Sequence, residues 1–151
     1  MDIGVGTFEV TGRMRVLVDE VLDTGRISYG PMSRAFEAKF AEIHGWQFAV
    51  LSNSGTSSLH VALQALKEQH GWVGGEVLVP AVTFVATVNV VLHNGMTPVL
   101  VDVDPQTYGI NPNKINPTSE TRAIMPAHLF GQPCDMARIA EFGFPVIEDS
   151  C

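Results

Sequence analysis

Apolar residues recur three and four positions apart in five stretches of the chain, a spacing that brings side chains to one face of an α-helix. These stretches predict helices at 13–23, 36–44, 56–69, from 81 to 93 and after 135. Short apolar runs between them predict strands at 48–51, 76–79, 97–103, 122–128 and 144–147. Because strands alternate with helices, we expect an α/β fold: a three-layer, mostly parallel sheet with helices on both faces.

The pattern also predicts which positions are buried and where a strand is irregular. The helical spacing puts Phe36, Phe40 and Ile43 on the core face of their helix, and the run 48–51 is apolar enough for a buried strand. Pro126 lies within the predicted strand 122–128, which favours an edge position or a local irregularity there.

Composition narrows the class of protein. A chain of 151 residues that is 46% hydrophobic can bury one good core. The net charge of −7 and the pI near 5.0 argue against a nucleic-acid or anionic-membrane binder. Cys134 and Cys151 do not make a disulfide framework, and the longest apolar stretches are too interrupted for a membrane span. We therefore expect a soluble protein of the reducing cytoplasm.

The turn between the strand at 48–51 and the following helix consists of small polar residues. Ser54 and Thr56 can cap the helix, and Gly55 lets a ligand approach the backbone. The unpaired N–H groups and the dipole of a helix N-terminus attract anions, so the turn predicts a phosphate site. A helix that is merely capped after a strand is the simpler alternative.

Other candidate residues follow the predicted strands. The carboxyl ends of parallel strands share one edge of a sheet, where ligands gather. Phe84, His128 and the pair Glu148-Asp149 come after three of these strands. A carboxylate such as Asp149, so close to an apolar strand, is costly without a cationic partner. The simpler alternatives are that Phe84 belongs to the core and that the acidic pair ends a strand in solvent.

One ligand accounts for this whole set of residues. Pyridoxal phosphate has a phosphate, a flat ring that suits an aromatic face, and a ring nitrogen that needs a carboxylate when it is protonated. The set therefore predicts a pyridoxal-phosphate site.

A series of short motifs also resembles the DegT/DnrJ/StrS family of sugar aminotransferases over nearly the whole chain. The motifs, in order, are Tyr29-Gly30-Pro31 with Phe36-Glu37, Asn53-Ser54-Gly55-Thr56, Pro80-Ala81-Val82-Thr83-Phe84-Val85-Ala86-Thr87, Val101-Asp102-Val103-Asp104, His128-Leu129-Phe130-Gly131-Gln132 and Glu148-Asp149-Ser150-Cys151. No single motif is sufficient, but the series is specific.

The resemblance implies part of the large domain of a fold-type I pyridoxal-phosphate enzyme, normally a homodimer with active sites at the subunit interface. It implies that Gly55 and Thr56, with Ser54 beside them, hold the cofactor phosphate. Phe84 would stack on the pyridine ring and Asp149 would pair with the pyridinium nitrogen. Family members transfer an amino group from glutamate to the keto group of a nucleotide-linked sugar. The resemblance also implies that the Tyr29 loop and the segment that begins at His128 lie near the substrate.

The lysine that such enzymes need for a Schiff base is not among the candidate residues. The only lysines are Lys39, Lys67 and Lys114, and none is predicted to lie at the ligand edge. In the family the lysine follows the Glu-Asp pair by some tens of residues, beyond Cys151. We therefore expect residues 1–151 to be the N-terminal part of the large domain, without the lysine segment and the C-terminal small domain, and to be inactive alone.

Several alternatives stay open. A branch of the family that has histidine in place of this lysine removes oxygen from sugars, so a sugar dehydratase is one of them. Another is an inactive truncated homologue that serves as a binding or regulatory protein. A nicotinamide or nucleoside-triphosphate enzyme is disfavoured, because Gly4-x-Gly6 is an incomplete fingerprint and no Walker loop occurs. The scattered histidines predict no metal site.

Overall fold

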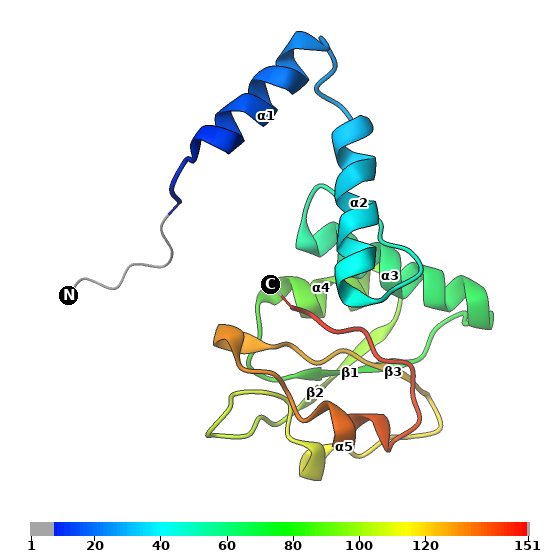
Figure 1. The fold of residues 1–151 in the computed structure, drawn as a ribbon. Helices are drawn as coiled ribbons and strands as arrows, with labels where there is room; N and C mark the ends of the chain where they lie inside the picture. Colours follow the sequence, from blue (N-terminus) through cyan, green and yellow to red (C-terminus); the bar gives the residue numbers. More distant parts are fainter. Residues whose placement is uncertain (1–7, 151) are drawn as a thin grey trace. The chain divides into compact units, whose positions relative to one another are not determined.

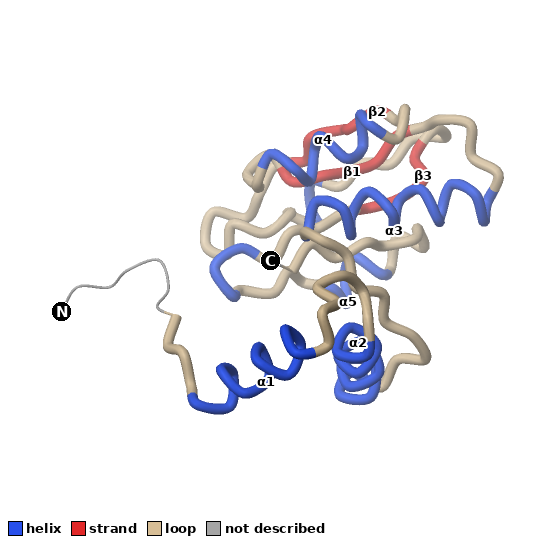
Figure 2. The backbone as a smooth tube through the Cα atoms, turned by 90° about the horizontal axis from the view of Figure 1, so that it is seen from above, coloured by secondary structure: helices blue, strands red, loops and turns tan. Residues whose placement is uncertain are grey.

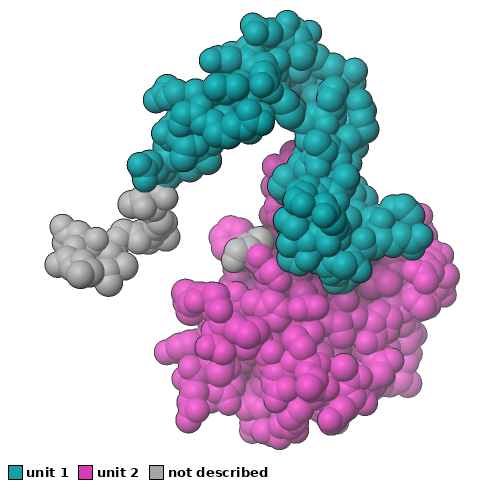
Figure 3. Space-filling model, viewed as in Figure 1, with its two compact units in different colours: residues 1–51 teal, residues 52–151 magenta. Residues whose placement is uncertain are grey.

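The computed structural model describes residues 8–150. The chain divides into two compact units, residues 1–51 and residues 52–151, which are coloured separately in Figure 3. No helix within residues 8–150 combines the length and the apolar character that a membrane crossing requires.

The first unit consists of two helices, as the periodicity predicted. Helix α1 spans Gly12–Asp23 and begins at Thr11, whose hydroxyl accepts a hydrogen bond from the Met14 N–H at 3.2 Å. Helix α2 spans Pro31–His44 and ends at Gly45, which adopts the left-handed φ of 66° that favours glycine. Local signals therefore determine the start of α1, where Thr11 is the cap, and the end of α2, where Gly45 follows the helix.

The apolar faces of these helices are largely uncovered. Helix α1 has no buried residue, and α2 buries only Ala41. The prediction that Phe36, Phe40 and Ile43 face a core is wrong for the described chain, since all three are exposed. One apolar hollow, which we call the α1 hollow, is lined by Leu17, Val18, Val21, Leu22, Ile27 and Met32.

The predicted buried strand at 48–51 is also absent. These residues form no strand, and Phe48 and Val50 are 76% and 81% exposed. A strand is stable only when a neighbour pairs with its backbone, and nothing within residues 8–150 pairs with this segment. The apolar run alone was therefore an insufficient signal.

The second unit is built on a parallel sheet with the order β2-β1-β3 (Figure 1). Strand β1 spans Glu76–Pro80, β2 spans Thr97–Val101 and β3 spans Thr121–Ile124. The register between β1 and β3 shifts by one residue: Glu76 is opposite Thr121, whereas Val77 is opposite Ala123. Strands β2 and β3 are shorter than predicted.

The last apolar run extends this sheet only through single bridges. Val146 pairs with Ile124 and Asp149 pairs with Ala127, both in the parallel direction. The predicted strand at 144–147 is thus replaced by isolated pairing. The segment nevertheless runs beside β3, which brings Asp149 to the carboxyl side of the sheet.

Helices cover both faces of the sheet, as predicted. Helices α3 (Gly55–His70) and α4 (Val85–His93) lie on one face, and α5 (Met136–Ala140) lies on the other (Figures 1 and 2). Two short 3₁₀ helices, η1 (Pro112–Lys114) and η2 (Leu129–Gly131), belong to the connections.

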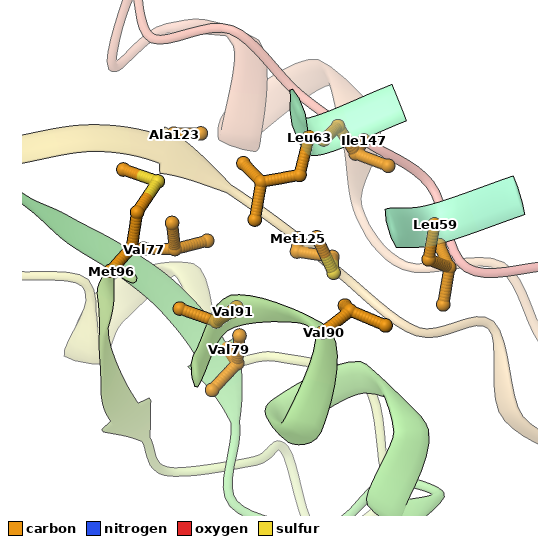
Figure 4. Packing of buried hydrophobic residues seen from close by; sticks show 10 residues of the cluster. All are labelled: Leu59, Leu63, Val77, Val79, Val90, Val91, Met96, Ala123, Met125 and Ile147. Atoms are coloured by element: carbon orange, nitrogen blue, oxygen red, sulfur yellow. The ribbon is translucent and has the colours of Figure 1, made fainter. Parts of the chain in front are cut away.

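Each face has its own hydrophobic core. The core under α3 and α4 contains Leu59, Leu63, Val77, Val79, Val90, Val91, Met96, Ala123, Met125 and Ile147 (Figure 4). The core under α5 contains Leu78, Val101, Ile110, Ile115, Ile124, Cys134 and Ile139. Leu63 is fully buried, so α3 is anchored to the sheet by its middle turn.

Helix α4 begins four residues later than predicted. The Ala81 N–H still donates to the Val101 carbonyl at 2.8 Å, so strand-type bonding continues past β1. Residues 82–84 then make the turn, and Phe84 has the extended φ and ψ of a residue that precedes a helix. Phe84 is therefore held at the entrance to the helix and not within it.

Candidate functional site

The candidate residues of the second unit gather at the carboxyl ends of the parallel strands. Helix α4 follows β1 and so begins at that edge, whereas α3 precedes β1 and begins at the same side before it runs back (Figure 1). The two helices pack against each other. Ser54 and Phe84, at the starts of α3 and α4, and Asp149 therefore share one side of the sheet.

Asp149 is buried and hydrogen-bonded. The residue is 7% exposed, and its Oδ2 accepts a hydrogen bond from the Thr87 hydroxyl at 2.6 Å. Its N–H donates to the Pro126 carbonyl, and its own carbonyl accepts from the His128 N–H, both at 2.9 Å. None of the ion pairs within residues 8–150 includes Asp149. A buried carboxylate without a cation is the environment that a cationic ligand group would complete.

The sequence left open that the acidic pair simply ends a strand in solvent. This is wrong for Asp149, which is buried, and correct for Glu148. Glu148 is exposed, as expected for successive side chains that point to opposite sides of an extended segment. The alternative that Phe84 is a core residue fails as well, because Phe84 is 70% exposed.

The start of α3 has both the predicted cap and free donors. The Ser54 hydroxyl accepts from the Ser57 N–H at 3.1 Å, which makes Ser54 the cap. The Ser52 hydroxyl donates to the Ser54 carbonyl at 2.7 Å and holds the turn. The first N–H groups of a helix have no intrahelical partner, so those of Gly55 and Thr56 stay available for an anion. The cap thus leaves the N–H groups of Gly55 and Thr56 unused.

The Ser54 cap leads to a prediction with two readouts. Ser54→Ala is expected to lower the free energy of unfolding by about 1 kcal/mol in urea titrations, because the Ser57 N–H loses its acceptor. Ser54→Asp should keep the cap and the stability, yet weaken phosphate binding because it adds a negative charge beside the anion position. Equal stability of the wild type and Ser54→Ala would contradict the assignment of Ser54 as the cap.

His128 uses both ring nitrogens within the chain. Nδ1 accepts from the Cys134 N–H at 3.0 Å, so Nδ1 carries no proton, and Nε2 lies 2.8 Å from Glu148 Oε2. In its neutral form His128 therefore donates its single N–H to Glu148. The Cys134 thiol donates to the Ala127 carbonyl at 3.2 Å, and burial raises its pKa. The substrate-binding role of His128 stays a prediction.

Tyr29 lies in the first unit, in the loop before α2. Its hydroxyl donates to Glu37 Oε2 at 2.5 Å, and Glu37 Oε1 accepts from the Leu51 N–H at 2.7 Å. The hydrogen bond to Glu37 raises the pKa of Tyr29, while the Leu51 N–H and then the Tyr29 hydroxyl lower the pKa of Glu37. Glu37 was not a sequence candidate. The role of Tyr29 toward a substrate also stays a prediction.

The three lysines have other partners or positions. Lys39 forms an exposed ion pair with Glu42 at 2.9 Å. Lys67 donates to the Asn94 carbonyl, at the ends of α3 and α4 that lie away from Ser54 and Phe84. Lys114 belongs to η1.

Thr83 and Thr87 are two further residues that sequence reasoning did not single out. Thr87 is fully buried and its hydroxyl lies 2.8 Å from that of Thr83. A usable signal existed, because the two threonines are four positions apart, with Thr83 just before a mostly apolar helix and Thr87 in its first turn. Buried hydroxyls need hydrogen-bond partners, and here the partner of Thr87 is Asp149.

Comparison with known proteins identifies the family of the chain. Residues 10–151 match the DegT/DnrJ/EryC1/StrS aminotransferase family. An aminotransferase from Psychrobacter cryohalolentis is 37% identical, with a TM-score of 0.83, over 93% of this chain and 37% of its own. NtdA from Bacillus subtilis, with bound cofactor PMP, is 38% identical, with a TM-score of 0.82, over 91% of this chain and 32% of its own.

A third solved structure is that of the GDP-4-keto-6-deoxy-D-mannose-3-dehydratase of E. coli with bound hydrated PLP. It is 25% identical, with a TM-score of 0.91, over 99% of this chain and 41% of its own. The chain thus spans less than half the length of each of these three proteins. Its sequence match and its fold of a parallel sheet between helices agree, and the chain belongs to the DegT/DnrJ/EryC1/StrS aminotransferase family.

Proposed function

We propose that this chain forms the cofactor-holding part of a pyridoxal-phosphate-dependent aminotransferase. The enzyme transfers the amino group of glutamate to the keto group of a nucleotide-linked sugar. Family membership supports the reaction class, and the bound PMP and PLP of two similar structures support the cofactor. The name of the E. coli dehydratase, a GDP-linked keto sugar enzyme, supports the substrate class.

The buried Asp149 carboxylate is the observation that carries this proposal. It is 7% exposed, it has no cationic partner within residues 8–150, and it lies on the side of the sheet where α3 and α4 begin. A protonated ring nitrogen would supply the missing positive charge. Phosphate chemistry alone would not need such a carboxylate.

The residues present fit pyridoxal phosphate. The N–H groups of Gly55 and Thr56, next to the Ser54 cap, would hold the phosphate at the start of α3. The exposed ring of Phe84 would cover one face of the pyridine, and Asp149 would pair with its nitrogen. When bound, the cofactor supplies an electron sink for amino-group transfer. Asp149 would keep the ring nitrogen protonated and so favour that role.

Further parts of the enzyme belong to the proposal. Tyr29 and His128 would contact the nucleotide sugar or shape its pocket, and a second copy of the chain would complete the site in a homodimer. The amine that attaches the cofactor and moves protons would come from a lysine other than Lys39, Lys67 and Lys114. This chain by itself would accordingly bind the cofactor without catalysing transamination.

Reconstitution tests the proposal. The chain is mixed with a lysine-bearing C-terminal part of a related aminotransferase, and glutamate-dependent amination of nucleotide-linked keto sugars is followed by mass spectrometry. We expect 2-oxoglutarate and an aminated sugar from the mixture, and neither from either part alone. Binding of pyridoxamine phosphate to the chain alone, measured by equilibrium dialysis, is the second readout. A mixture that associates and binds the cofactor but aminates no sugar would contradict the transaminase proposal.

A sugar dehydratase is the second candidate. The E. coli dehydratase has a TM-score of 0.91 over 99% of the chain, although its identity of 25% is lower than the 37% and 38% of the two aminotransferases. A parallel reconstitution with a histidine-bearing C-terminal part of a sugar dehydratase separates the candidates. Dehydration removes one oxygen from the sugar in that mixture, whereas transamination in the lysine-bearing mixture replaces the oxygen by nitrogen. Absence of association, cofactor binding and activity would favour a binding or regulatory protein.

A further inference from the structure

We propose that Thr83 and Thr87 form a one-directional chain of hydroxyl hydrogen bonds that positions the Asp149 carboxylate for a cationic ring nitrogen. Both threonines would act through Asp149, so they are positioning residues and not catalytic residues. This inference rests on the proposed function and adds two residues to its cofactor site.

The number of hydrogens that each group can donate determines the direction of this series of hydrogen bonds. A carboxylate can only accept, and a hydroxyl has one hydrogen to donate. Thr87 therefore gives its hydrogen to Asp149 Oδ2, 2.6 Å away. The 2.8 Å contact between the two hydroxyls must then be a donation from Thr83 to Thr87. Hydrogen bonds in such a series polarise one another, so Thr83 strengthens the bond that Thr87 makes.

Burial makes this arrangement rigid. Thr87 is fully buried in the first turn of α4, and Asp149 is 7% exposed. The segments of the two residues are also packed together, because Val90 of α4 and Ile147 contribute to the same core (Figure 4). Threonine has few side-chain rotamers, and one of its usual options in a helix is to bond a carbonyl of the preceding turn. Here Thr87 instead bonds a carboxylate 62 positions away in sequence.

The consequence concerns the second carboxylate oxygen. With Oδ2 taken by Thr87, Oδ1 has no hydrogen-bond partner within residues 8–150. The carboxylate is therefore held in one orientation while one oxygen stays available for a ligand. Phe84 lies between the two threonines and directly precedes the helix, so the same turn presents the aromatic ring and orients the carboxylate.

Binding of two related probes to the full chain tests this proposal. One probe is pyridoxamine phosphate, which carries its own amine and needs no lysine; the other is the analogue in which C–H replaces the ring nitrogen. Thr87→Val removes the hydroxyl at nearly constant volume, and Thr87→Ser restores it. We expect Thr87→Val to raise the dissociation constant for pyridoxamine phosphate about 3- to 10-fold, with less change for the analogue. Thr87→Ser should bind both probes like the wild type.

Other outcomes separate this proposal from the proposed function. Equal weakening of both probes by Thr87→Val would mean a structural tie between α4 and the sheet and would overturn the positioning role. Unchanged binding would overturn it too, with the proposed function intact. If the wild type bound neither probe, the positioning role and the proposed function would both be contradicted. Urea unfolding of each variant checks the fold, and if Thr87→Val does not fold, Thr83→Val replaces it, with about a 2- to 3-fold effect expected on pyridoxamine phosphate only.

Discussion

Asp149→Asn is expected to raise the dissociation constant of this chain for pyridoxamine phosphate about 10- to 100-fold, since a hydrogen bond to a charged group contributes about 1.5–3 kcal/mol. The substitution keeps the size of the side chain and an oxygen that can accept from Thr87. It removes the negative charge that would favour a protonated ring nitrogen. Equilibrium dialysis or calorimetric titration measures the effect directly.

The neighbouring acid offers a matched control for this prediction. Glu148→Gln makes the same chemical change one residue away, on a side chain that is directed to His128 and exposed. Its affinity for pyridoxamine phosphate should stay within about 2-fold of the wild type, because surface charges at a distance are screened by salt. Identical losses in the two variants, or no loss in Asp149→Asn, would remove Asp149 from the cofactor site.

Leu63→Ala is expected to lower the free energy of unfolding by about 2–5 kcal/mol. Leu63 is fully buried in the core between α3 and the sheet, where truncation leaves a cavity (Figure 4). A loss of this size is a large fraction of the stability of a small domain. Urea titration followed by circular dichroism gives the value.

Val61→Ala is the control on the same helix. Val61 is 56% exposed, so its truncation should change the free energy of unfolding by no more than about 0.5 kcal/mol. The contrast between the two positions tests the burial of α3 and not its helical propensity. Equal effects at both positions would show that α3 does not pack on the sheet as described.

Features determined by nearby residues could be predicted from the sequence. The helices at α1, α2 and α3, the capping role of Ser54 and the Asp135 start of α5 all depend on contacts within one or two helical turns. The parallel strand β1 followed from its apolar run between glycine and proline. Phe84 and Asp149 could be placed at the strand ends because the order of elements determines which edge they reach.

Features that depend on distant partners could not be predicted. Residues 48–51 have the composition of a strand, but pairing requires a neighbour that composition does not reveal. The late start of α4 depends on the bond from Ala81 to β2, and the bridges at 146 and 149 depend on β3 and the residues that follow it. The contact between Thr87 and Asp149 likewise joins two segments with no local signal in common.

The α1 hollow has a practical consequence for work on this chain. Its six apolar side chains, together with Phe36, Phe40 and Ile43 of α2, form apolar surface that is exposed to solvent. Exposed apolar patches of this kind bind molecular chaperones and hydrophobic dyes, and they promote aggregation at high protein concentration. Bacterial expression of residues 1–151 would therefore favour co-purification with a chaperone, and titrations are best started from dilute samples.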